Sequence, residues 1–213
     1  MAAREYGQYG GISHALELVG ERWALLIIRD LLVGPRRYSE LAAGLPRIPT
    51  NILATRLKEL QAAGVLRRVP HSRVIVYELT AYGLELEPVV LGLGAWGFKA
   101  MAEPRDDQII TPDSLTIDLR TAFRPQVAAT LPATSYGARL GAADLLIRVD
   151  GSRLDVSRRD GPVDLSFAGG AGIHRLISGE LAPELAVASG AIEVLQGQSD
   201  LLPRFARTFH VAA

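Results

Sequence analysis

Side chains able to read base edges recur at helical spacing between Pro49 and Leu66. On a 3.6-residue period, one side of the expected helix is apolar and carries Leu53, Leu57 and Leu60. The opposite side is small, polar and singly cationic, with Asn51, Thr55, Lys58 and Ala62. Asn51 can pair with adenine, Lys58 can reach guanine or a phosphate, and Thr55 offers a hydroxyl and a methyl group. This face suits a duplex groove better than a protein core.

Cations surround that helix. From Arg36 to Arg73 there are eight lysines and arginines and two acidic residues, although the whole chain has a net charge of zero. Such a local excess favours contact with phosphates, which release counterions when they are neutralised. We predict Thr50 as the helix N-cap, with its free backbone N–H groups near a phosphate. The predicted DNA-contacting residues are Arg36, Arg37, Thr50, Asn51, Thr55, Lys58, His71 and Arg73.

The alternative is an ordinary surface helix whose charges are only solvated, which is the common explanation for a lone basic helix. Two short β-rich runs separated by His71–Ser72–Arg73 follow Gly64, however, and a short helix precedes the basic one. Helix, turn, helix and basic-tipped hairpin together indicate a winged helix-turn-helix. Arg56 lies at the border of the apolar face, and we predict that it braces the motif through a carboxylate.

The flanking segments position this motif. We predict helices at Ile12–Gly20, Arg22–Val33 and Ser39–Ala43, with Trp23, Leu26, Ile27 and Leu31 facing inward in the second. Thr80 is predicted to cap an apolar helix from Ala81 to about Met101, in which Pro88 starts a fresh segment. Helices this apolar on a small domain need a second subunit to cover them. We therefore expect a homodimer.

Four motifs carry a resemblance to a known family. They are Gly–x–x–Trp (Gly20–Trp23), RDLLVGPRRYSEL (Arg29–Leu41), N–x–L–x–x–RL–x–x–L (Asn51–Leu60) and YELT (Tyr77–Thr80). Over roughly Tyr9–Gly97 the chain resembles the HxlR-type winged-helix transcriptional regulators. The resemblance implies a homodimer joined through its first and last helices and bound to double-stranded operator DNA. Many members sense thiol-reactive compounds through a cysteine before the first helix, but this chain has no cysteine, which excludes that mechanism here.

The composition changes after Ala102. From Glu103 onward eleven arginines meet fourteen acidic residues, so this half is not expected to contact DNA. Asp113 is predicted to cap a helix to Phe123, and a meander of strands follows, at Val127–Leu131, Tyr136–Leu140, Leu145–Val149, Leu154–Ser157 and Val163–Phe167. Asp150–Gly151 and Asp160–Gly161 are typical of hairpin turns. The last predicted elements are helices Gly172–Ser178 and Pro183–Ala188, strand Ile192–Leu195 and helix Leu201–Phe209.

This order of elements is similar to a sterol-carrier-protein-type domain. The supporting runs are Val149–Gly169 and GEL–x–P–x–x–A–x–x–SG–x–I–x–V at Gly179–Val194. The resemblance implies an apolar tunnel for a small hydrophobic or lipid-like ligand. The candidate lining residues are Phe167, Ile173, Leu176, Leu185 and Phe205. Each of them fits a filled core equally well, and a filled domain would serve for dimerisation or as a scaffold.

Several patterns point away from catalysis. GLGAWG at Gly92–Gly97 matches a dinucleotide fingerprint but lies within a helical apolar run, without the strand that this chemistry requires. The four histidines lack metal-ligand spacing, and no cysteine assists them. No nucleophile elbow or paired carboxylates stand out. We expect no enzyme activity, no cofactor and no metal.

The sequence thus predicts an α+β chain with a winged helix-turn-helix domain at 1–102, a linker at 103–112 and a sterol-carrier-like α+β domain at 113–213. The expected function is a DNA-binding transcriptional regulator, as a homodimeric repressor. The alternative is a lipid-binding or carrier protein whose N-terminal domain mainly dimerises it. Without a leader-like segment or a run of about 18 apolar residues, a cytoplasmic protein with no membrane contact is expected.

Overall fold

The computed structural model describes residues 5–102, 105, 107–140 and 143–211. The chain divides into two compact units, Met1–Val90 and Leu91–Ala213. This division falls within one helix, α6 (Glu87–Phe98), whereas the sequence predicts the first domain to extend to residue 102. In the predicted linker, Glu103, Pro104 and Asp106 lie outside the described residues.

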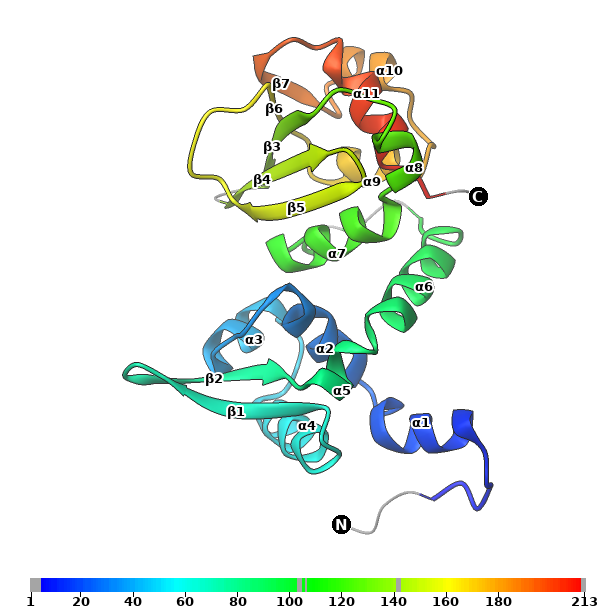
Figure 1. Ribbon diagram of the computed structural model, residues 1–213, viewed down its shortest axis with the longest axis vertical. Helices are drawn as coiled ribbons and strands as arrows, with labels where there is room; N and C mark the ends of the chain where they lie inside the picture. The colour runs from blue at the N-terminus through cyan, green and yellow to red at the C-terminus, as the bar shows by residue number, and fades with distance from the viewer. Residues whose placement is uncertain (1–4, 103–104, 106, 141–142, 212–213) are drawn as a thin grey trace. The chain divides into compact units, whose positions relative to one another are not determined.

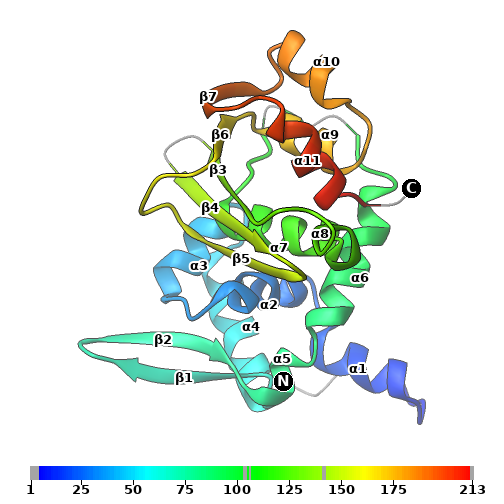
Figure 2. The same ribbon diagram turned by 45° about the horizontal axis from the view of Figure 1, so that its top comes forward.

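The N-terminal unit is a winged helix-turn-helix (Figure 1). Its elements are α1 (Gly11–Val19), α2 (Ala24–Val33), α3 (Tyr38–Gly44), α4 (Thr50–Ala62), β1 (Leu66–His71), β2 (Val74–Leu79), α5 (Ala81–Leu84) and the start of α6. Strands β1 and β2 pair antiparallel and project as a hairpin beside α4 (Figure 2). The break between α5 and α6 confirms that a new helical segment starts near Pro88.

The leucine side of α4 makes the core of this unit. Leu53, Leu57 and Leu60 are almost fully buried and share that core with Ile27 and Ile28 of α2. Burial of one apolar helix face, rather than helix propensity, supplies most of the stability of a helix this short. Gly64, with φ of 71°, follows the helix and turns the chain into β1.

Three N-terminal predictions need correction. Trp23 has φ of 81°, so α2 begins at Ala24 rather than at Arg22. Leu26 does not face inward, since 39% of it is exposed. Pro49, not Thr50, is the N-cap of α4, because Thr50 already has helical backbone geometry. Leu26 lies one residue away from the buried stripe, where periodicity is least decisive.

The C-terminal unit is an α+β fold around one sheet. Its helices are the rest of α6, α7 (Pro112–Ala122), α8 (Pro125–Ala128), α9 (Ala171–Ile177), α10 (Pro183–Ala188) and α11 (Leu201–Thr208). Its strands are β3 (Thr134–Leu140), β4 (Ala143–Asp150), β5 (Arg153–Arg158), β6 (Leu165–Ala168) and β7 (Glu193–Gly197). They are ordered β5-β4-β3-β6-β7, with β3 and β6 parallel.

This order contradicts a simple meander. Asp150–Gly151 makes the predicted hairpin between β4 and β5, but Asp160–Gly161 does not join neighbours, because β6 pairs with β3 rather than with β5. Val127–Leu131 is not a strand: Pro125 begins the short helix α8 there. The N-cap of α7 is Thr111 rather than the predicted Asp113. The Thr111 hydroxyl accepts a hydrogen bond from the backbone N–H of Ser114.

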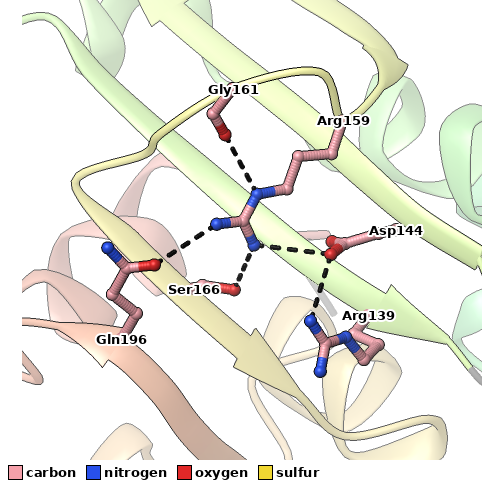
Figure 3. Close-up of polar contacts among 6 residues, drawn as sticks. All are labelled: Arg139, Asp144, Arg159, Gly161, Ser166 and Gln196. Atoms are coloured by element: carbon pink, nitrogen blue, oxygen red, sulfur yellow. Dashed lines mark hydrogen bonds and ion pairs between the residues drawn. The ribbon is translucent and has the colours of Figure 1, made fainter.

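One face of the sheet packs against the helices, and alternate strand residues such as Tyr136, Ala138, Ile147 and Phe167 enter the core. Across the other face runs the connection from β5 to β6, which must pass β4 and β3. Figure 3 shows Arg159 at the start of this connection, where its guanidinium donates to Ser166 Oγ (2.7 Å) and to Asp144 Oδ2 (3.4 Å). The crossing therefore has polar partners on the strands that it covers.

Candidate nucleic-acid interface

The outer side of α4 is free to meet a partner. Asn51 and Lys58 are exposed, Thr55 between them is half-buried, and the leucines occupy the opposite side. Within the described residues, neither the Asn51 amide nor the Lys58 ammonium has an intramolecular partner. The Thr55 hydroxyl donates to the backbone oxygen of Asn51 (2.8 Å), so its proton is used within the helix. The acceptor lone pair and the methyl group remain for an outside contact.

Side chains from neighbouring elements hold α4 in place. The Tyr38 hydroxyl of α3 donates to the backbone oxygen of Thr50 (2.8 Å), which fastens the start of α4. Arg56 Nη2 contacts Glu21 Oε2 at 2.8 Å, and Arg56 Nη1 also pairs with Glu59. The Arg56 side chain is only 14% exposed. This confirms the prediction that Arg56 braces the motif through a carboxylate.

The hairpin places cations at its end. His71 and Arg73 are both exposed, and a two-residue turn, Ser72–Arg73, separates the strands. Ser72 adopts a left-handed φ of 54°, which a tight hairpin turn requires. Arg67 pairs across the hairpin with Glu78 at 2.7 Å, so its charge is balanced locally. No carboxylate in the described part of the hairpin pairs with Arg73.

The remaining predicted contacts differ in accessibility. Arg37 and Thr50 are exposed, at the starts of α3 and α4 respectively. Arg36 is half-buried, because its backbone pairs with Tyr77 of β2 in both directions, at 3.0 and 2.7 Å. The Arg36 backbone therefore helps to attach the wing to the helices.

Comparison with known proteins identifies this arrangement. The HxlR-like helix-turn-helix family profile matches residues 18–105. The HTH-type transcriptional regulator YodB of Bacillus subtilis is 38% identical over 95 residues, which cover 43% of this chain and 84% of YodB. The chain belongs to the HxlR-like helix-turn-helix family.

Other similar proteins are also named as HTH-type transcriptional regulators. An uncharacterized HTH-type transcriptional regulator of Mycobacterium tuberculosis is 40% identical over 101 residues, or 46% of this chain. The match spans 63% of that relative's own length, less than two thirds. Among solved structures, the reduced form of YodB is 35% identical and has a TM-score of 0.39, covering 46% of this chain and 99% of that one. These relatives of the HxlR-family chain are named as transcriptional regulators.

Sequence reasoning missed two residues of the HxlR-like unit. Tyr38 positions α4, and the aromatic position in the RRYSEL run was the signal for it in the sequence. Arg68 is exposed on β1 and adds a cation to the wing. A basic pair such as Arg67–Arg68 does not reveal which member is neutralised, since that depends on which strand residue stands opposite.

The predicted ligand-lining residues lie in the second unit, outside the HxlR-like match. Phe167, Ile173, Leu176 and Phe205 are at most 1% exposed, whereas Leu185 is 62% exposed. The Phe205 ring contacts the ring of Phe167, with centroids 5.1 Å apart. These four side chains belong to the buried core cluster of the second unit, whereas Leu185 is exposed to solvent.

The described residues contain neither a metal-binding cluster nor a membrane-spanning helix. No group of three or more histidine, cysteine, aspartate or glutamate side chains in that part of the chain is arranged to hold a metal ion. No helix there has the length and apolar character needed to cross a membrane.

Proposed function

We propose that the protein binds double-stranded operator DNA as a homodimeric repressor, with α4 in the major groove and the β1–β2 wing on the phosphate backbone. The exposed pair Asn51 and Lys58 carries this proposal, because both side chains project from a helix whose other side is buried. A helix fits the major groove, where amides and cations distinguish base pairs. The family membership supports the same role.

The roles of individual residues follow from their positions. Asn51 and Thr55 are the proposed readers of base edges, and Lys58 contacts guanine or a phosphate. Arg37, His71 and Arg73 are the proposed phosphate contacts, together with the backbone N–H groups beside Thr50. Arg36 joins them through its guanidinium. In a dimer, two copies of α4 would meet half-sites about 34–36 Å apart.

We also propose that the C-terminal domain, with its sterol-carrier-like order of elements, senses a small hydrophobic ligand. A regulator without cysteine needs a signal other than thiol chemistry. The carrier alternative is not favoured, since it leaves the exposed face of α4 and the family membership without a role.

The test is fluorescence anisotropy with DNA from the region around the protein's own gene, over a range of salt concentrations. Asn51→Ala and Thr55→Ala should reduce the preference for operator over random DNA. Arg73→Ala should weaken both equally and reduce the salt slope by about one. Arg67→Ala is the matched control on the same hairpin, and its effect should be smaller because Glu78 already balances Arg67.

Equal losses on operator and random DNA in all of these variants would contradict the assigned roles. Absence of binding by the wild-type chain to any DNA from this region at low salt would overturn the proposal itself.

A further inference from the structure

The C-terminal unit contains a cavity that none of the predicted ligand-lining residues reaches. Its volume is about 710 Å³, within the range of roughly 300–1,000 Å³ typical of small-molecule sites. Its walls are formed by the end of α6, by residues 99–102, 105 and 108–110, by α7, by α9 with Ser178 and Glu180 after it, and by Val211. All of its lining residues belong to the unit Leu91–Ala213.

Two helices contribute matching stripes. Ser114 and Asp118 of α7 are four residues apart and share one face, while Ala171, His174 and Ser178 recur on one face of α9. His174 Nε2 and Asp118 Oδ2 lie 2.9 Å apart, so a polar contact joins the two walls. The His174 ring also stacks on Phe98, the last residue of α6, with centroids 6.1 Å apart. These contacts hold three walls in a fixed arrangement, as a preformed site requires.

Most charged side chains of the described walls have a partner nearby. Arg175 pairs with Glu180 at 3.0 Å, Arg105 pairs with Asp107 at 3.3 Å, and His174 faces Asp118. Lys99, directly after α6, has no carboxylate partner among the described residues. The Lys99 ammonium is therefore available to attract an anion into the cavity.

The same cavity has an apolar side. Met101 and Ile109 are 56% and 59% exposed, which is unusual for large apolar side chains lining one hollow. Phe98 and Val211 extend this apolar surface inward, since both are buried. An occupant with an apolar body would remove Met101 and Ile109 from water, at roughly 25 cal/mol for each Å² covered.

We propose that this cavity binds a small amphipathic carboxylate, with its anionic head at Lys99 and its apolar body against Phe98, Met101 and Ile109. The proposal rests on the ligand-sensing role given above to the C-terminal domain and places the ligand in this cavity rather than among the predicted lining residues. Binding there would contact the final turn of α6, the helix that begins in the DNA-binding unit.

The test is isothermal titration calorimetry of the full chain, without DNA, using octanoate, octanol and octylammonium. These probes share one chain and differ in head-group charge. Octanoate should bind with one-to-one stoichiometry and most tightly of the three. Lys99→Met should weaken octanoate by about fivefold and leave octanol unchanged, as expected for one partly solvated ion pair.

Two further variants test the walls. Ala171→Phe should reduce binding of both octanoate and octanol, because it fills the hollow from α9. Should that variant fail to fold, Met101→Asp serves instead: its side chain is exposed, and the change should weaken octanoate while favouring octylammonium. Lys58→Met, on α4, is the matched control and should leave octanoate affinity unchanged.

Failure of octanoate to bind, equal binding of octanoate and octylammonium, or unchanged affinity in Lys99→Met would each overturn the proposal. Operator binding is measured separately by anisotropy. Loss of the carboxylate site would therefore leave the DNA-binding proposal standing, and the reverse also holds.

Discussion

Arg159 lies against the outer face of the C-terminal sheet because Gly137 beneath it has no side chain. A Cβ atom at Gly137 would stand 2.8 Å from Arg159 Nη1 and 3.0 Å from Ser166 Oγ. The guanidinium cannot easily move aside, since it also donates to the backbone oxygen of Gly161 at 3.2 Å. Asp164 is the last residue of the same connection, directly before β6. Hydrogen bonds from the backbone N–H and the hydroxyl of Ser135 lower the pKa of the Asp164 carboxyl group.

Gly137→Ala should therefore lower the free energy of unfolding by about 1–3 kcal/mol, because the new methyl group overpacks a polar contact that is already satisfied. Urea denaturation followed by circular dichroism measures the change. Gly161→Ala is the control, since a Cβ atom there meets nothing within 4 Å. Equal stability of the two variants would contradict this account of the crossing.

Tyr136 provides a second residue-scale prediction, at alkaline pH. Burial raises the pKa of Tyr136 to about 12, from a model-peptide value near 10. A raised pKa in the folded state means that stability is complete below pH 10 and decreases as the pH rises from 10 to 12. The loss can reach roughly 2–3 kcal/mol for one group.

Tyr136→Phe should remove this part of the alkaline destabilisation, whereas Tyr82→Phe, at a 52% exposed position, should keep it. Thermal unfolding recorded between pH 8 and about 11 compares the two. Parallel curves for both variants would show that ionisation of Tyr136 is not the cause.

At the scale of elements, α6 combines three glycines with different surroundings. A Cβ atom at Gly94 would lie 3.0 Å from Thr121 Oγ1 of α7, and that hydroxyl donates to the backbone oxygen of Ile117 at 2.8 Å. At Gly92 and Gly97 a Cβ atom would meet nothing within 4 Å. Gly94 is therefore a site of close helix–helix packing, whereas Gly92 and Gly97 are not.

Gly94→Ala should destabilise the protein, because Thr121 is held by its own hydrogen bond and cannot turn away. Gly97→Ala should instead stabilise it by about 0.5 kcal/mol through reduced freedom of the unfolded chain. Urea denaturation of the two single variants distinguishes packing from propensity. A gain in stability for Gly94→Ala would show that the contact between α6 and α7 can accommodate a methyl group.

Most elements were predictable from local pattern, and the two exceptions have different causes. The leucines of α4 are buried at the helical spacing that the sequence predicts, and the predicted hairpin forms beside that helix. Val127–Leu131 was wrong because Pro125 starts a helical turn that its apolar residues also fit. Asp160–Gly161 has the composition of a hairpin turn, but β6 finds its partner in β3. Strand pairing between distant segments leaves no local signal.

At the scale of the whole molecule, large apolar side chains remain exposed on α1 and α6. Ile12 is 80% exposed on α1, while Leu93 and Trp96 are 45% and 74% exposed on α6. Such residues are expected to be covered by another subunit. This supports the homodimer through the first and last helices that the family resemblance implies.

Trp96→Glu should produce a monomer and weaken operator binding by more than about tenfold, because a dimer gains from contacting both half-sites at once. Light scattering coupled to size-exclusion chromatography measures the mass, and anisotropy measures the affinity. Leu185→Glu, at a 62% exposed position on α10, should preserve the dimer. A dimeric Trp96→Glu with full affinity would exclude α6 from the interface.

The sequence alone determined the winged helix-turn-helix and the exposed polar side of α4, because these depend on spacing within short segments. The tertiary structure decided which side chains fill space and which enclose it. Phe167 and Phe205 became core, while Lys99, Asp118 and His174 were brought to one cavity from separate helices and the segment after α6. An apolar residue has the same local pattern beside a cavity as inside a packed core, so only packing between distant segments distinguishes the two.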